Sequence, residues 1–525
     1  MRAAVLALLL MVCGTFAAEA APWRITKDHW DAQDEIGYGR FITALGDSGC
    51  NSSQSCLRDP ANPYRGSDGA FLDIDVDCAK LPYLLRAYYA WKNGLPFSYV
   101  NGVAGTRFGN TSNRIVGRAS IIDNGGGING AAALRQMIDS VYSATFRTDA
   151  RTDHAVPSDF YSPAIQPGSI RPGTIIYDTN AHIGIVYRVE ASGRIHYMDA
   201  HPDFTITRSV YGAQFGRSSA ALGWGLKNWR PLQLTGARRN AGRLVGGRYV
   251  FARNNQIRDF SLVQYFGNGP RPTDAQWKSG GFMLNNQRMD YYDFVRASLS
   301  GGRLRFNPVQ EIADLVLSNC ADLSYRAEAI DISLAAGIQN RPQPGRLPLN
   351  IYGTEGDWET YSTPSRDARL KTAFKEVRDN AERFLTLWRA RDPQIVYNGF
   401  DLAGDMLGAY DRAAARCTVS YKRTDGSDVR FGYEEARRRL FRFSFDPYHC
   451  VERRWGADNV ESATCRDTMV KRRWYDAQQR LRNQLDRSYE AKMDFNLLEL
   501  EEGRGGVAQP PDVDARAYLM SQRGR

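Results

Sequence analysis

Three residues of the types that support nucleophilic catalysis occur in the order Cys78, His182 and Asp199. A cysteine nucleophile needs a base that takes its proton and a third group that fixes the tautomer of that base. His182 opens one short run of apolar residues, and Asp199 closes the next run. A hairpin would bring these two ends level, with the imidazole and the carboxylate within hydrogen-bond reach. The pattern therefore indicates a Cys-His-Asp triad.

Three short runs around His182 and Asp199 are expected to be β-strands. They cover Ile175–Tyr177, His182–Val189 and Ile195–Asp199. The first two runs are apolar and partly β-branched, and the third alternates with a period of two residues, which places its odd-numbered side chains on one face. Ala191-Ser192-Gly193 has the composition of the turn between the last two strands.

Cys78 is expected at the start of a helix that runs to about Lys92. Apolar side chains recur there at three- and four-residue spacing, namely Leu81, Leu84, Leu85, Tyr88 and Trp91. Asn93-Gly94 supplies the stop signal. At a helix N-terminus the exposed N–H groups and the helix dipole stabilise a thiolate and lower its pKa. The same N–H groups would form an oxyanion hole.

The number of cysteines is informative. The chain has eight cysteines, and Cys13 lies in a leader-like segment, so seven are left for an oxidising compartment. We expect the pairs Cys50–Cys56, Cys320–Cys417 and Cys450–Cys465, although the sequence alone does not choose among the possible connectivities. Cys78 is then the odd cysteine, which favours a reactive thiol or an intermolecular bridge.

Residues 1–21 have the pattern of a secretory signal peptide. Arg2 precedes the apolar run Ala3–Val12, and Ala18-Glu19-Ala20 fits an A-x-A cleavage site. A lipoprotein anchor at Cys13 is disfavoured because Val12 is bulkier than the usual small residue. No internal run reaches the roughly 18 apolar residues of a membrane span. We therefore expect a secreted protein of the bacterial periplasm with no transmembrane segment.

The composition is that of a globular protein, with 43% hydrophobic residues and a net charge of +10. A positive charge favours anionic partners such as cell-wall polymers, a membrane surface or nucleic acid. The arginines are interspersed with acids, as in Tyr433–Arg439, which is typical of a solvated helix face. Export also argues against a nucleic-acid partner.

Shifts in composition and the positions of glycine and proline divide the chain into segments. The expected order is a signal peptide (1–21), an irregular N-terminal extension (22–59), a hydrolase domain (60–235), a linker or mixed segment (236–305), a helical disulfide-containing domain (306–500) and a disordered tail (501–525). Within the helical domain, Asn307-Pro308 reads as an N-cap followed by Pro at N1, Thr363-Pro364 begins a second helix, and a third is expected over 467–497.

The residues around the triad resemble a known family. Asp77-Cys78-Ala79 looks like the Asp-Cys-Ser/Ala signature of NlpC/P60 cysteine peptidases. Pro63-Tyr64-Arg65-Gly66 resembles a tyrosine-containing segment upstream of that cysteine. Residues 171–176 and 182–186 are similar to the family's Pro-Gly-Asp and His-Val-Gly-Ile strands. The spacing from His182 to Asp199 also looks like that of the related CHAP amidases.

The resemblance, which covers residues 60–235 only, implies an α+β fold, with a papain-like domain followed by a mostly helical one. It implies cleavage of amide bonds in peptidoglycan peptides or other envelope peptides. Matched by position, Cys78 would be the nucleophile, His182 the base, Asp199 the orienting group and Tyr64 a residue near the oxyanion hole. The chain departs from the pattern in a longer gap between cysteine and histidine and in Thr174, which replaces the common Asp.

Other functions stay open. Leu85-Arg86 and Gly94-Leu95-Pro96 resemble transglutaminase-like proteins, which implies an acyl transferase. A non-catalytic envelope-binding or scaffold protein is a third possibility, with the helical part as the binding module.

The other histidines near the triad suggest further roles. His196 and His201 raise the possibility of a zinc site with His182 and Asp199, but no H-E-x-x-H motif occurs and His196 should point away from Asp199. We therefore expect no metal and no cofactor. His201 is an alternative to Asp199 as the third triad member.

Overall fold

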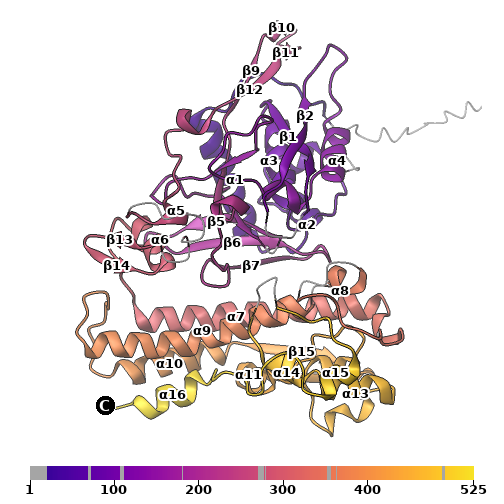
Figure 1. The fold of residues 1–525 in the computed structure, drawn as a ribbon, viewed down its shortest axis with the longest axis vertical. Helices are drawn as coiled ribbons and strands as arrows, with labels where there is room; N and C mark the ends of the chain where they lie inside the picture. The colour runs from indigo at the N-terminus through magenta and orange to yellow at the C-terminus, as the bar shows by residue number, and fades with distance from the viewer. Residues whose placement is uncertain are drawn as a thin grey trace, which may run out of the picture.

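The computed structural model describes residues 21–68, 72–106, 111–179, 181–269, 277, 280–351, 356–361, 363–486 and 491–524. Nearly all of the expected signal peptide lies outside these residues. The described chain has a mixed α+β fold, as expected, and divides into a sheet half (residues 21–305) and a helical half (residues 306–524), one above the other in Figure 1. None of the helices in the described part of the chain is long and apolar enough to cross a membrane.

A six-stranded sheet forms the centre of the sheet half, in the order β3-β8-β4-β5-β6-β7. Its strands are β3 (Phe160–Tyr161), β4 (Ile175–Asp178), β5 (His182–Val189), β6 (Ile195–Ala200), β7 (Ile206–Val210) and β8 (Gly225–Trp229). All neighbours are antiparallel. The three strands expected around His182 and Asp199 are confirmed as β4, β5 and β6, because their β-branched and alternating residues fill both faces of the sheet.

One face of the sheet is covered by α1 (Ala32–Ser48) and α3 (Lys80–Lys92). The prediction of an irregular extension over 22–59 is wrong, because α1 buries an apolar stripe in the main core. Its buried members include Tyr38, Phe41, Ile42 and Leu45. Gly46 lies where any side chain would collide with the ring of Tyr187 on β5, so glycine permits the close approach of α1 to the sheet.

Smaller elements complete this side of the sheet half. They are α2 (Ser53–Arg58), the hairpin β1 (Phe97–Ala104) and β2 (Arg114–Ile121), and α4 (Gly130–Ser140). Asn129 caps α4 by accepting a hydrogen bond from the N–H of Ala132. The Asn129 side chain thus satisfies one of the backbone N–H groups at the start of α4.

The segment that we expected to be a linker packs on both sides of the sheet half, with residues 236–251 beside the core of α1 and α3 and residues 260–299 against the opposite face of the sheet. This segment contains β10 (Arg238–Asn240), β11 (Arg243–Val245), β12 (Arg248–Phe251), α5 (Val263–Phe266), β13 (Phe282–Leu284), β14 (Gln287–Met289) and α6 (Tyr291–Leu299). β12 pairs with β9 (Leu232–Thr235), and the aromatic residues of α6 pack against Val186 and Tyr197 of the sheet. Residues 236–305 therefore belong to the sheet half.

The helical half is built on α7 (Pro308–Ala335), α9 (Thr363–Arg389) and α10 (Leu402–Ala414), with their apolar stripes in one core. Asn307 caps α7 and Pro308 occupies its first turn, as predicted. Shorter elements of this half are α8 (Gly356–Tyr361), β15 (Thr418–Lys422), β16 (Asp428–Gly432), α11 (Tyr433–Arg439) and α12 (Val451–Arg454).

The C-terminal residues differ from the prediction. The single helix expected over 467–497 is divided into α13 (Met469–Ala477) and α14 (Gln479–Asn483), and α15 (Leu497–Glu501) follows. The expected disordered tail contains α16 (Ala515–Gln522), whose Leu519 is fully buried in the helical core. The tail is mostly polar in composition, and for this reason the sequence did not predict that a few of its apolar residues pack into the core.

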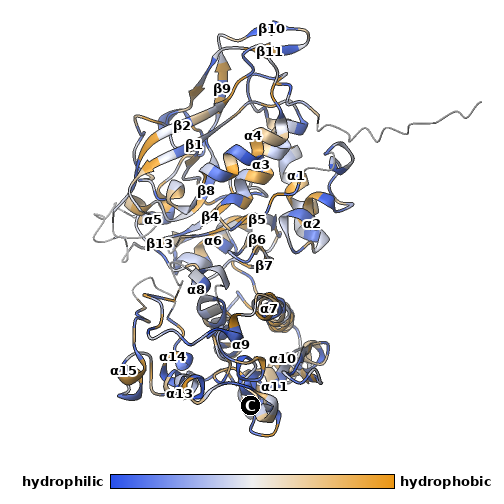
Figure 2. Ribbon diagram, turned by 90° about the vertical axis from the view of Figure 1, so that its right-hand side faces the viewer, coloured by the Kyte–Doolittle hydropathy of each residue, from blue (hydrophilic) through white to orange (hydrophobic). Residues whose placement is uncertain are grey.

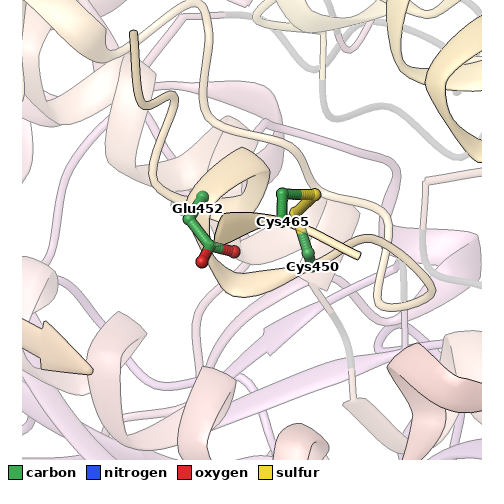
Figure 3. A group of neighbouring side chains, drawn as sticks. All are labelled: Cys450, Glu452 and Cys465. Carbon is green, nitrogen blue, oxygen red and sulfur yellow. A yellow bond between two sulfur atoms is a disulfide. The ribbon is translucent and has the colours of Figure 1, made fainter. Parts of the chain in front are cut away.

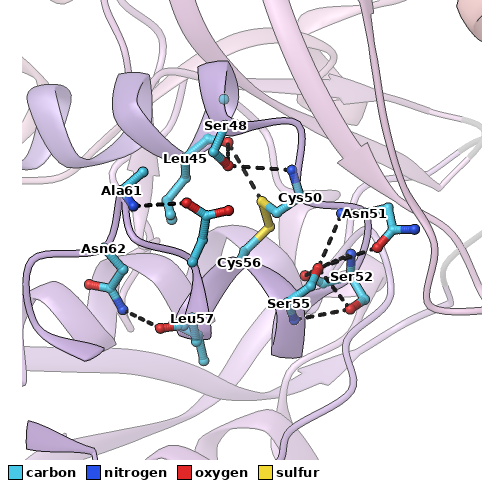
Figure 4. Close-up of a disulfide and its surroundings, with 12 residues drawn as sticks. Leu45, Ser48, Cys50, Asn51, Ser52, Ser55, Cys56, Leu57, Ala61 and Asn62 are labelled. Atoms are coloured by element: carbon cyan, nitrogen blue, oxygen red, sulfur yellow. Dashed lines mark hydrogen bonds between the residues drawn. A yellow bond between two sulfur atoms is a disulfide. The ribbon is translucent and has the colours of Figure 1, made fainter. Parts of the chain in front are cut away.

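The three expected disulfides are confirmed as Cys50–Cys56, Cys320–Cys417 and Cys450–Cys465. The first joins the end of α1 to α2, where Ser52 caps the short helix (Figure 4). Cys78 is the free cysteine of the described chain.

The helical half contacts the sheet half beneath β6 and β7. α7 lies along β7, and both Figure 1 and the side view in Figure 2 show α7 and α9 directly below the sheet. Side chains from α9 can therefore reach the ends of β5 and β6, where His182 and Asp199 lie.

Candidate functional site

His182 and Asp199 form the expected pair. Nε2 of His182 lies 2.6 Å from Oδ2 of Asp199, and the Asp199 side chain is fully buried. β5 and β6 are neighbours in the sheet, so the start of one strand lies beside the end of the other. A carboxylate that contacts one ring nitrogen holds the imidazole in a fixed orientation, which is the role of the third member of a nucleophilic triad.

The Asp199 carboxylate has two further partners. Oδ1 accepts a hydrogen bond from the hydroxyl of Thr207 on β7, and Oδ2 accepts one from Nη1 of Arg369 at 2.8 Å. Burial raises the pKa of the Asp199 carboxyl, but Arg369 and the two histidines outweigh that effect and hold its pKa well below the usual range. Asp199 is therefore an anion at neutral pH.

His201 is not the third triad member. Its Nε2 donates to Thr207 Oγ1 at 3.0 Å, because the single proton of that hydroxyl is already given to Asp199. Its distance to Asp199 Oδ2 is 3.9 Å. Burial, together with the cations of Arg366 and Arg369, lowers the pKa of His201 to about 3 despite nearby Asp199. His201 is thus a neutral donor that supports Asp199 through Thr207.

Cys78 lies at the start of α3, beside the first residues of β5. Its thiol donates to the carbonyl oxygen of Ala181 at 3.6 Å, and Ala181 directly precedes His182. Burial, followed by the charge of Asp77, raises the pKa of the Cys78 thiol. The expected lowering of this pKa at a helix N-terminus is therefore wrong for this arrangement, in which the sulfur is a protonated thiol.

Asp77 explains why the helix start does not stabilise a thiolate. The helix begins at Lys80 rather than at Cys78, and Oδ1 of Asp77 accepts hydrogen bonds from the N–H groups of Ala79 and Lys80. These are the donors that we expected to form an oxyanion hole. In this arrangement they are occupied by a carboxylate, which also places a negative charge beside the sulfur.

The thiol and the imidazole approach the start of β5 from different faces of the sheet. Side chains alternate along a strand, so His182 shares a face with Gly184, which lies against the ring of Tyr197. The His182 ring also stacks near Phe215, at 6.3 Å between ring centroids. Cys78 packs against the core on the α3 side. The hydrogen bond of the thiol accordingly goes to backbone and not to the ring.

The structure does not bring Tyr64 to this site. Its hydroxyl is hydrogen-bonded to the side chain of Asn93, the residue that ends α3. Cys78 lies at the other end of this 13-residue helix, which is about 20 Å long. The assignment of Tyr64 to the oxyanion hole is therefore wrong: the tyrosine belongs to an aromatic cluster with Phe41, Tyr88 and Tyr89.

Arg369 is a residue of the candidate site that the sequence did not reveal. It comes from α9 in the helical half, and its Nη2 lies 2.8 Å from Nε2 of His182 while Nη1 binds Asp199. One helical turn earlier, Arg366 binds Asp203 at 2.8 Å. The arginine is separated from His182 by 187 positions in an arginine-rich chain, so no local pattern distinguishes it.

A metal site is not supported by the described residues. The one group of potential ligands that they place close together is Cys450, Glu452 and Cys465, shown in Figure 3. The two sulfurs form a disulfide and are therefore not thiolate ligands. The Glu452 carboxylate accepts hydrogen bonds from Thr424 and Thr464. Near the triad, His196 contacts Glu190 instead of the other histidines.

Comparisons with known proteins leave the function to be argued from this geometry. No protein-family model matches the chain, no curated protein is significantly similar to it, and no solved structure matches it significantly.

Proposed function

We propose that this protein is a secreted cysteine peptidase or amidase of the bacterial periplasm, with a papain-like site that cleaves amide bonds in peptidoglycan peptides. The observation that carries the proposal is the 2.6 Å contact between His182 and Asp199 beside the free thiol of Cys78. An imidazole oriented by a buried carboxylate and an unpaired cysteine beside the start of the same strand are components that nucleophilic acyl transfer requires. The net charge of +10 suits an anionic wall polymer as the surrounding substrate.

The proposed reaction proceeds through an acyl-enzyme. His182 takes the proton of the Cys78 thiol, and the thiolate attacks the carbonyl carbon of the scissile amide. The carbon–sulfur bond forms, the carbon–nitrogen bond breaks, and the amine leaves with the proton held by His182. A water molecule, deprotonated by His182, then hydrolyses the thioester to a carboxylic acid and the free thiol.

This reaction needs a contact between the Cys78 sulfur and the His182 ring that the structure does not contain. The sulfur and a ring nitrogen must come within hydrogen-bond reach, whereas the thiol now binds the carbonyl of Ala181. The His182 side chain is 12% exposed and Asp199 is fully buried, so the helical half also restricts substrate access. We therefore interpret this arrangement as a resting state of the enzyme.

The test is digestion of purified peptidoglycan and of its isolated stem peptides by the mature protein, with products identified by mass spectrometry. Cys78→Ala and His182→Ala are the paired controls. New peptide fragments that disappear in both variants would support the proposal and identify the bond. Fragments that persist in Cys78→Ala would refute a cysteine mechanism.

A second readout separates hydrolysis from acyl transfer. Incorporation of a labelled primary amine into a glutamine-containing peptide would favour a transglutaminase-like transferase over a hydrolase. The enzyme proposal would be refuted if neither assay gave a product and the Cys78 thiol of the wild-type protein did not react with iodoacetamide. A binding role for the helical half would then be the explanation to test.

A further inference from the structure

Four basic side chains are buried together in the helical half. They are Arg326 on α7, Lys371 on α9, Arg454 on α12 and Arg482 on α14, and each residue is at most 2% exposed. Arg326 acts electrostatically on both Lys371 and Arg454, and Arg482 acts on Lys371, so the four charges are close neighbours. We call these four residues the basic cluster. Lysine and arginine are almost never fully buried without partners, so the partners of each member matter.

An acidic partner is present for one of the four cations. Arg326 forms a bidentate ion pair with Asp367, with contacts of 2.7 and 2.9 Å. Arg482 donates to neutral acceptors instead, namely the carbonyl oxygen of Tyr475 and Oε1 of Gln479. These contacts satisfy donors of Arg482 but leave its charge uncompensated.

The other two cations have fewer partners still. Nε and Nη1 of Arg454 are fully buried and lack a hydrogen-bond acceptor within the described chain. The ammonium of Lys371 forms neither a hydrogen bond nor an ion pair with a described residue, and the ring of Phe441 lies 6.0 Å from it. Other buried donors without a described acceptor are Nη1 of Arg326, Nε of Arg482, and Nε and Nη1 of Arg366, a neighbour of Arg454. The region therefore has more hydrogen-bond donors than acceptors.

The charges of the region do not cancel. Asp446 is the buried carboxylate that acts on Arg454 besides Asp367, and it accepts hydrogen bonds from the side chains of Gln343 and Gln478. Asp476 acts on Arg482 as well, but it is exposed to water, which screens its charge. One buried carboxylate thus stands against the three cations that have no ion pair, which leaves two positive charges in excess.

The two side chains without acceptors stay mainly cationic at neutral pH. Burial, followed by the charge of Arg326, lowers the pKa of Arg454 to about 9. Burial, with a smaller effect from Arg482, lowers the pKa of Lys371 to about 8 although Asp367 opposes the change. Buried charges without counter-charges are costly, because burial removes the water that would stabilise them. A ligand that supplies negative charge and acceptor atoms removes this cost.

A compact oxyanion meets both requirements. Phosphate and sulfate carry up to two negative charges and present several oxygens that accept hydrogen bonds. The planar guanidinium group of arginine matches the oxygens of such ions, and lysine binds them as a point charge. Because the basic cluster is closed to solvent, the ion has to be small.

We propose that the basic cluster is a binding site for one divalent oxyanion of the phosphate or sulfate class. The ion accepts hydrogen bonds from Arg454 and Lys371 and balances the two excess charges. It links α9 to α12 and α14, so its binding stabilises the helical half. This site does not involve Cys78 or His182, and the proposal is independent of the proposed function.

The first experiment measures binding to the full mature chain, purified without phosphate or sulfate. Ion chromatography after denaturation detects an oxyanion carried through purification. Equilibrium dialysis in a chloride buffer of constant ionic strength then measures uptake of radiolabelled phosphate and, in a parallel arm, of radiolabelled sulfate. Both the native protein and protein refolded from urea with its disulfides intact are tested, because a buried site exchanges slowly. We expect one oxyanion per chain, either carried through purification or taken up, and the two arms identify the preferred ion.

The variants are Arg454→Met and Lys371→Met, with Arg438→Gln as the control. Methionine fills the volume of the side chain without its charge. Arg438 is a surface residue that pairs with Glu435, so its loss should leave binding unchanged. Each Met variant is expected to bind phosphate at least roughly ten-fold more weakly than the wild type. Circular dichroism verifies the fold of each variant.

Thermal melting gives a second readout. Replacing chloride by phosphate at constant ionic strength should raise the melting temperature of the wild type by roughly 5 °C once the site is saturated. The Met variants should show no such rise. Without any oxyanion they should be at least as stable as the wild type, because each has lost an uncompensated buried charge.

Three results would overturn the proposal. The first is a wild type that neither carries an oxyanion through purification nor takes one up in the native or the refolded form. The second is uptake that both folded Met variants retain in full. The third is a melting shift of equal size in the wild type and the Met variants, which would be the general stabilisation that excluded salts produce.

Discussion

Nη1 of Arg369 lies 2.8 Å from Oδ2 of Asp199, although the two residues are 170 positions apart and belong to different halves of the molecule. A buried carboxylate is tolerated only when it is paired and hydrogen-bonded. The helical half therefore supplies part of the electrostatic environment of the candidate site. The sheet half by itself would lack a cation that pairs with the buried Asp199 carboxylate.

Replacing Asp199 by Asn should strongly reduce any Cys78-dependent hydrolysis. The amide keeps the shape of the carboxylate but loses the charge that stabilises the imidazolium and fixes its tautomer. The loss in kcat/KM on a stem peptide is expected to be roughly 10²- to 10⁴-fold. Asp203→Asn is the matched control, since Asp203 pairs with Arg366 and makes no contact with His182. Equal losses in both variants would argue against a specific role for Asp199.

Replacing Asp77 by Asn should make Cys78 more reactive. The Asn side chain keeps an oxygen that can accept hydrogen bonds from Ala79 and Lys80, so the helix start is preserved. The variant removes the negative charge that contributes, after burial, to the raised pKa of the thiol. The midpoint of the alkylation rate against pH is expected to fall by about one unit.

Asp75→Asn is the control for this experiment, because that exposed carboxylate is hydrogen-bonded to Gln54 rather than to the helix start. No shift of the midpoint in Asp77→Asn would mean that burial alone raises the pKa of Cys78.

His201 should make the folded protein less stable in acid. Burial lowers its pKa to about 3 in the folded state, whereas an unfolded histidine titrates near 6.5. The unfolded state therefore binds a proton that the folded state does not, and stability falls as the pH drops from about 6.5 toward 3. The contribution to the free energy of unfolding is on the order of a few kcal/mol at the acid end of this window.

The comparison is urea unfolding of the wild type and His201→Gln across this pH range. Asp199 has a depressed pKa as well, so its contribution is lost only in stronger acid, as the pH falls below about 4 toward its folded pKa. A His201→Gln variant with the same loss between pH 6.5 and 4 as the wild type would show that other groups cause the acid sensitivity.

Removing the Cys320–Cys417 disulfide should destabilise the helical half more than removing Cys50–Cys56 destabilises the sheet half. The first bridge closes a loop with a sequence separation of 97, the second one of 6. In the chain-entropy account, the longer loop contributes roughly 2 kcal/mol more to stability. Paired Cys→Ala variants, followed by urea unfolding, measure this difference. A larger loss for the short loop would contradict the entropic account here.

Much of the local structure was determined by the sequence itself. The alternation and β-branching of β4, β5 and β6 predicted their positions, and the order of His182 and Asp199 along a hairpin predicted their contact. The odd cysteine singled out Cys78. These features follow from short-range periodicity and from the bonding preferences of single residue types, which are readable without knowledge of distant contacts.

Only the tertiary structure decided what surrounds these residues. It moved Tyr64 to the far end of α3, placed α1 in the core and brought Arg369 to His182. It also showed that Asp77 occupies the helix start beside Cys78. Each of these depends on the packing of elements far apart in the chain. A side chain acquires its partners and its burial from that packing, so residue type and spacing alone could not specify them.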